Sequence, residues 1–329
     1  MKMKKLSVLL LALLLASTVL VGCGGEKEPE DTSYKPEPTS GMVGNYTITP
    51  TWLPFDSPFV LTEITDNKNE VGAGGEIYIL DSTKLYQYQL NGSALTKANE
   101  LDLENEAESL SIDNNGVLWT GYGPSYPIDG IKDMQKATAT TIKMDIEMAP
   151  DGTWGLGYWV NKPVELVKND GTTFTSEPWQ YDVNGAPYGN VSAVYITDTH
   201  TYVTGSKEAV TTIAVFDPSG NLVAELGHNE SGSQDLMGHI TSMVETPNGF
   251  IAADSNLHRL EYWTPDYQFI GYIELDSILG TDGAYISDMS LAADGSVYAN
   301  VVQMQQQPEK AKKDAEPQYE LLVFKLTGF

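Results

Sequence analysis

The sequence predicts an all-β fold and, within that class, a β-propeller of six four-stranded blades. One unit recurs along the chain: a turn rich in glycine, asparagine or aspartate, followed by an apolar or aromatic strand. The copies are centred on positions 75, 116, 152, 200, 249 and 295, at steps of 41, 36, 48, 49 and 46 residues. Several units add a second hairpin, and four strands in about 45 residues is the size of a propeller blade.

The six turn-and-strand copies occupy residues 74–79, 115–119, 151–154, 198–203, 248–252 and 294–298. Their turns contain residues that accept positive φ at low cost, so each turn can join two antiparallel strands directly. The second hairpin is clearest in 211–226 and 259–273. Residues 120–190 are less regular, and a seventh blade in that region stays open.

The last repeat is one strand short of a blade. Its strands are expected at 286–291, 297–304 and 319–326, while 46–51 near the start is a strand candidate that no repeat uses. We expect this early strand to become the missing outer strand, because a closed ring buries both apolar faces of every blade. A β-sandwich, or two smaller all-β domains, is the alternative architecture.

The stretch 240–273 is the most complete repeat. It places a strand, a turn, a strand, the step from Asp254 to Arg259, a strand and a turn in that order. In this order it resembles the blades of NHL-type and SMP-30-like propellers. The resemblance implies a metal-dependent hydrolase or lyase, with calcium or magnesium bound by carboxylate and amide oxygens at the mouth of the axial channel.

Metal-ligand candidates follow from that resemblance. The comparable positions at the starts of blades are Glu63, Glu108, Asn190 and Asp288. The Glu-Gly-Pro motif expected in the first blade is absent, and Thr62-Glu63-Ile64 stands in its place. The sequence also has no nucleophile-elbow serine, no metal-binding histidine pair at helical spacing and no glycine-rich phosphate loop. Whether the protein is an enzyme therefore stays open, with the pattern favouring a non-enzymatic function.

Ligand-binding candidates come from the aromatic residues, since 11 of the 32 fall within 119–195. Tyr122 and Tyr126 belong to a Gly-Pro loop after a strand, and Trp159 is near a blade end. Such rings can form a platform for a glycan or a peptide, although blade packing is the alternative role for each. His239 precedes the innermost strand of a blade, where it is expected to face the channel.

The N-terminus has the pattern of a secretion signal. Lysines at positions 2, 4 and 5 precede an apolar stretch at 6–21, and Leu-Val-Gly leads to Cys23, the single cysteine. This ending resembles the lipobox of bacterial lipoproteins. The resemblance implies removal of a signal peptide, 1–22, and a diacylglyceryl group on Cys23, often with an amide-linked acyl chain such as palmitate. A plain secretory signal or a membrane anchor is the alternative.

These features divide the chain into the signal peptide, a lipidated cysteine with a flexible linker at 23–41, and a propeller at 42–329. The linker is rich in proline, glycine and charge, which disfavours a packed core. The net charge of −26 becomes −29 without the signal peptide, and so acidic a chain repels nucleic acid.

We therefore expect a module on the extracytoplasmic face of a bacterial membrane, with the linker more typical of a cell with one membrane. Its partners would be the membrane, through the lipid, and a glycan, a peptide or an envelope protein. A metal-dependent hydrolase or lyase and a scaffold subunit of an envelope complex are the alternatives.

Overall fold

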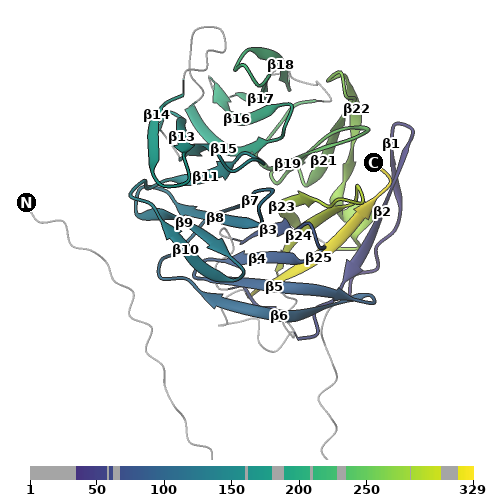
Figure 1. Cartoon of the computed structure of the whole chain (residues 1–329). Coiled ribbons are helices and arrows are strands. Elements are labelled where there is room, and N and C mark those ends of the chain that lie inside the picture. The colour runs from purple at the N-terminus through teal and green to yellow at the C-terminus, as the bar shows by residue number, and fades with distance from the viewer. Residues whose placement is uncertain are drawn as a thin grey trace, which may run out of the picture. The chain divides into compact units, whose positions relative to one another are not determined.

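The structure is a computed structural model that describes residues 35–57, 59–61, 67–159, 162–179, 189–207, 210–227, 235–281, 283–304 and 318–329. For 137–139, 189–190, 206–207 and 210 it describes the backbone alone. The part from Lys35 to Phe329 forms one compact unit, and its sheets confirm the predicted all-β class (Figure 1). Within the described ranges, no helix is both long and apolar enough to cross a membrane.

Five blades are formed by four consecutive antiparallel strands each. Blade 1 contains β3 (Asn67–Val71), β4 (Ile77–Asp81), β5 (Lys84–Asn91) and β6 (Ala94–Asp102), and blade 2 contains β7 (Ser109–Ile112), β8 (Val117–Tyr122), β9 (Tyr126–Lys132) and β10 (Gln135–Ala139). Blade 3 contains β11 (Asp145–Met148), β12 (Trp154–Tyr158), β13 (Glu165–Asn169) and β14 (Phe174–Pro178). Blade 4 contains β15 (Gly189–Ile196), β16 (Thr201–Lys207), β17 (Val210–Phe216) and β18 (Leu222–Leu226), and blade 5 contains β19 (Ile240–Thr246), β20 (Gly249–Asp254), β21 (Arg259–Trp263) and β22 (Phe269–Glu274).

The sixth blade joins the two ends of the propeller. It contains β23 (Tyr285–Leu291), β24 (Val297–Met304) and β25 (Tyr319–Thr327), followed across the sheet by β2 (Tyr46–Leu53) and β1 (Gly41–Val43). β2 pairs with β25 in antiparallel register, as the purple and yellow strands in Figure 1 show. The prediction that an early strand closes the ring is thus confirmed, and β1 adds a fifth strand at the outer edge.

The blade count is also confirmed as six. All six predicted turns join the first strand of a blade to the second, because they directly precede β4, β8, β12, β16, β20 and β24. The irregular region after residue 120 contains the two outer strands of blade 2 and the whole of blade 3, so the seventh blade was not needed. The sandwich alternative is wrong, because the sheets surround an axis instead of stacking in two layers (Figure 1).

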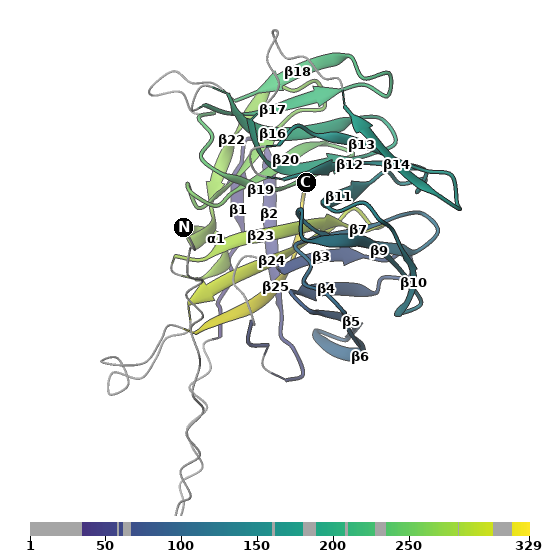
Figure 2. The same cartoon turned by 90° about the vertical axis from the view of Figure 1, so that its left-hand side faces the viewer.

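The first strands of the blades, β3, β7, β11, β15, β19 and β23, pack next to one another around this axis. All six run in the same direction, so the molecule has two different faces. We call the side with the turns between first and second strands the hairpin face. The opposite side, where one blade leads to the next, is the connection face; the short helix α1 (Leu275–Leu279) lies on it (Figure 2).

The chain enters the propeller at the connection face. The Thr39 N–H donates to the Ile278 carbonyl oxygen of α1 at 2.8 Å, and the Thr39 hydroxyl donates to the Ser277 carbonyl oxygen at 3.0 Å. Gly280 ends α1 at a φ of 67°, and a Cβ there would lie 2.5 Å from the Glu37 carbonyl oxygen. Only glycine fits both the left-handed backbone and this close approach. The first described residues are therefore fixed to the junction of blades 5 and 6.

Candidate functional site

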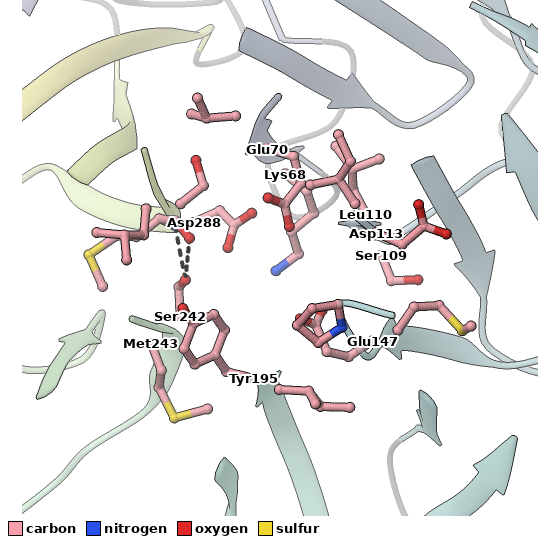
Figure 3. Close-up of a pocket in the computed structure, with 18 of the residues that line it drawn as sticks. Lys68, Glu70, Ser109, Leu110, Asp113, Glu147, Tyr195, Ser242, Met243 and Asp288 are labelled. Carbon is pink, nitrogen blue, oxygen red and sulfur yellow. Dashed lines mark hydrogen bonds between the residues drawn. The ribbon is translucent and has the colours of Figure 1, made fainter. Parts of the chain in front are cut away.

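An axial cavity of about 400 Å³ lies between the first strands of the blades. Residues from all six strands line it, including Lys68, Ser109, Glu147, Tyr195 and Asp288 (Figure 3). Turn residues of the hairpin face line its outer part: Ala73, Asn114, Pro150 and Ala293. The cavity therefore extends from the middle of the propeller toward the hairpin face.

Five charged side chains line this cavity (Figure 3). Asp113 accepts hydrogen bonds within its own hairpin, from the backbone N–H groups of Asn115 and Val117 and from Trp119 Nε1. The other four are Lys68 and Glu70 on β3, Glu147 on β11 and Asp288 on β23. Lys68 and Glu70 are two residues apart, so the alternation of a β-strand directs both to the same side. In the part of the chain that the structure describes, none of the four forms an ion pair. Besides Asp113, the cavity thus contains three carboxylates and one ammonium group that form no ion pair with one another.

The protein surroundings raise the pKa of all three carboxyl groups. Burial is the largest cause of the raised pKa of Glu70, followed by the charges of Glu147 and Asp288. Burial also raises the pKa of Glu147 most, with Asp288 adding to it, while the Ile196 N–H and Lys68 act in the opposite direction. For Asp288, burial raises the pKa against the opposing charge of Lys68. These groups therefore hold a proton more tightly than exposed carboxylates do.

Asp288 is held in place by the neighbouring blades. The Asn69 N–H of blade 1 donates to Asp288 Oδ2 at 2.8 Å. On the other side, the Met289 N–H donates to the Ser242 hydroxyl of blade 5 at 2.9 Å. Asn69 Nδ2 also donates to Asn300 Oδ1 at 3.1 Å, inside the junction of blades 6 and 1. This polar network fixes the junction at which the ring closes.

Of the four predicted metal ligands, Asp288 alone is placed in the cavity. Glu108 lies just before β7, where its N–H donates to the Gly121 carbonyl oxygen, and it is not part of the cavity lining. Asn190 is in β15, where only the backbone is described, and Glu63 lies outside the described residues. Among the described side chains, no three His, Cys, Asp or Glu residues come together as metal ligands.

The predicted ligand-binding aromatics do come together at the junction of blades 2 and 3. The Tyr122 and Tyr126 rings have centroids 5.6 Å apart at 51°. Trp159 of the next blade lies against Gly123, so close that a Cβ on this glycine would be 3.6 Å from Trp159 Cε3. All three rings are half-buried. We call Tyr122, Tyr126 and Trp159 the aromatic edge; it lies on the connection face.

Two polar contacts complete the aromatic edge. The Gly123 N–H donates to Asp145 Oδ1 at 2.8 Å, which fixes the loop of blade 2 to the first strand of blade 3. The Lys162 ammonium lies 5.2 Å from the centre of the Trp159 ring, within the range of a cation–π contact. The edge therefore offers aromatic faces next to a carboxylate and an ammonium group.

His239 is exposed and does not line the axial cavity, although it directly precedes β19 as expected. Its N–H donates to Asp254 Oδ1 at 3.1 Å, and the Gly238 N–H donates to Asp254 Oδ2 at 2.6 Å. Arg259 pairs with the buried Glu261 at 2.6 Å. The Asp254 and Arg259 pattern of the most complete repeat thus stabilises the blade itself.

Lys68, Glu70 and Glu147 were not predicted from the sequence. For Lys68 and Glu70 a signal was present in β3, which reads Asn-Lys-Asn-Glu-Val and is far more polar than a strand buried on both sides usually is. One face of this strand, Asn67 and Asn69, is buried in the blade junction, so the other face had to meet the axis.

No known protein family matches the sequence, and no curated protein is similar to it. Solved structures do resemble it. Virginiamycin B lyase from Staphylococcus aureus shares 12% identity at a TM-score of 0.50, over 86% of this chain and 100% of that chain. A streptogramin B lyase structure shares 10% identity at a TM-score of 0.52, over 86% of this chain and 98% of that chain. Hydrazine synthase from Kuenenia stuttgartiensis shares 12% identity at a TM-score of 0.51, over 74% of this chain and 95% of that chain. At such low identity these likenesses show the propeller fold alone.

Proposed function

We propose that this protein is a β-propeller lipoprotein, anchored through Cys23 to the extracytoplasmic face of a bacterial membrane, that binds a glycan or a peptide without catalysing a reaction. The observation that carries the proposal is the convergence of Tyr122, Tyr126 and Trp159 from two blades. Half-exposed rings give a large apolar contact area, and their polar tips can still form hydrogen bonds.

The position of the first described residues supports an anchored module. Residues 35–40 lead into β1 at the connection face, where Thr39 contacts α1. Twelve peptide steps separate Lys35 from Cys23, and a chain of that length reaches at most about 40 Å. A lipid on Cys23 would therefore keep the aromatic edge within reach of membrane-proximal glycans and peptides, while two or more acyl chains would make the attachment stable.

Glycan and peptide arrays test the binding function. The wild-type propeller should capture a defined set of probes, and the triple variant Y122A/Y126A/W159A should lose roughly tenfold or more in affinity for them. Tyr272→Ala is the matched control, because this tyrosine is 40% exposed on blade 5, away from the aromatic edge. Equal capture by the triple variant, with an unchanged circular dichroism spectrum, would rule out the edge as the binding site.

A metal-dependent hydrolase or lyase is the second candidate, and one observation favours it: Asp288, the best match to the SMP-30-like pattern, lines the axial cavity. Calcium or magnesium that raises the melting temperature, with reversal by EDTA, would support this candidate, since a ligand stabilises the state it binds. A scaffold subunit would instead co-purify with envelope proteins and bind no array probe.

A further inference from the structure

We propose that the axial cavity is a second binding site, which takes an aliphatic polyamine, an organic cation with several ammonium groups. This site is separate from the aromatic edge, because the cavity extends toward the hairpin face and the edge lies on the connection face. The proposal does not depend on what the edge binds.

The charges in the axial cavity favour a cationic occupant. Glu70, Glu147 and Asp288 bring three carboxylates into the cavity, and Lys68 brings one ammonium group. None of them forms an ion pair with another described residue. Backbone N–H groups donate to the carboxylates, for example that of Asn69 to Asp288, but no opposite charge neutralises them, and a buried charge that is not neutralised is costly. A positively charged occupant would stabilise the ionised carboxylates and balance their excess over the single charge of Lys68.

The separation of the three carboxylates favours an occupant with several positive groups. The three carboxylates come from β3, β11 and β23, three strands that are not all neighbours around the axis. Among the described residues no three acidic or histidine side chains converge as the ligands of one metal ion. A flexible chain with separate ammonium groups can meet such dispersed carboxylates, whereas a single small ion cannot. The volume of about 400 Å³ is within the range of small-molecule sites.

Ser290 supports the proposal independently of the acidic groups. Ser290 lies two residues after Asp288 on β23, on the same side of the strand, and lines the cavity. Its side chain is 4% exposed, and its hydroxyl oxygen has no hydrogen-bond partner in the described part of the molecule. A buried hydroxyl group is normally satisfied, so this oxygen is a ready acceptor for an ammonium N–H group.

Because Lys68 carries the opposite charge to the carboxylates, variants of the two kinds of residue should change polyamine affinity in opposite directions. Its ammonium group shares the cavity with the carboxylates and would repel a polyamine. Removing the carboxylate of Glu147 should weaken binding, and removing the charge of Lys68 should strengthen it. A purely structural role for these residues predicts no such pair of opposite effects.

The test is titration calorimetry of the full-length propeller with spermidine at constant ionic strength. We expect Glu147→Gln to weaken binding by about tenfold and Lys68→Met to strengthen it several-fold. Glu225→Gln, which makes the same change in charge on the exposed strand β18, should bind as the wild type does. The triple variant of the aromatic edge should also bind spermidine normally, which separates this test from that of the proposed function.

Three outcomes would overturn the proposal. One is equal spermidine affinity in wild type, Glu147→Gln and Lys68→Met. Another is an equal loss in Glu225→Gln, which would indicate surface attraction alone. The third is calcium or magnesium binding the cavity as tightly as spermidine does. If Glu147→Gln fails to fold, Lys68→Met alone decides, because unchanged or weaker binding by that variant contradicts the electrostatic argument.

Discussion

Glu147 illustrates how a single residue shapes the chemistry of the axial cavity. Its carboxyl group is one of three on separate strands, and both burial and the charge of Asp288 raise its pKa. The folded state therefore holds a proton on this group at pH values where the unfolded chain, with an ordinary pKa of 4.5, has already lost it. Ionisation in the folded state weakens the fold.

This shift predicts how stability depends on pH. Above the ordinary carboxyl pKa of 4.5, the free energy of unfolding should fall as pH rises through the raised folded-state pKa values. Glu147→Gln removes one ionising group, so it should flatten the fall and make the protein more stable than the wild type at about pH 8. Urea unfolding at about pH 5 and about pH 8 measures both slopes. A variant that is no more stable than the wild type at the higher pH would contradict this account.

The aromatic edge was predictable at the residue scale and the cavity charges were not. Tyr122 and Tyr126 stand out in sequence because they flank a Gly-Pro turn, and a short loop keeps them together. Glu147 lies 77 positions after Glu70, and the two residues share the cavity only after β3 and β11 have packed around the axis. No pattern local to either strand shows this.

At the scale of elements, β2 is the strand on which ring closure depends. Ile48 is fully buried and packs in a cluster with residues of blades 5 and 6. Leu53 is 2% exposed and packs in a cluster with residues of blades 1 and 6. The strand also supplies the hydrogen bonds of the outer edge of β25. Without β2, blade 6 would have three strands and an open apolar side.

Ile48→Ala therefore should lower the melting temperature by about 5 to 10 °C, because the deleted methyl groups leave a cavity in a packed core. Met42→Ala on the adjoining β1 is the matched control, since Met42 is 67% exposed and its loss should leave the melting temperature nearly unchanged. Thermal unfolding by circular dichroism measures both. Equal melting temperatures for Ile48→Ala and the wild type would mean that β2 does not hold the ring closed.

The positions of the strands were predicted mainly from the turns between them. The turns before the second strands were all placed correctly, because four of the six contain an Asn-Gly or Asp-Gly pair and the other two contain glycine or aspartate, residues typical of tight hairpins. The outer strands of blades 2 and 3 were harder to place. β14 has one half-buried residue and four exposed ones, so it shows no apolar alternation. β1 has three residues, too few for any periodicity.

At the scale of the whole molecule, the two candidate sites lie toward opposite faces. The aromatic edge shares the connection face with the first described residues, and the axial cavity extends toward the hairpin face. On the proposed model of attachment, one face would meet ligands close to the membrane, while the other would meet small molecules that diffuse from outside. This separation follows from the parallel direction of the six first strands.

The most direct test of the central claim is a single fractionation experiment with array binding as its readout. Cells producing the wild type, Cys23→Ser or the aromatic triple variant are separated into membrane and soluble fractions, and each fraction is applied to the same glycan and peptide arrays. We predict that capture follows the wild type into the membrane fraction and Cys23→Ser into the soluble fraction, and that the triple variant stays in the membrane fraction without capture. Cys23→Ser remaining in the membrane fraction, or the triple variant capturing the same probes as the wild type, would contradict the account.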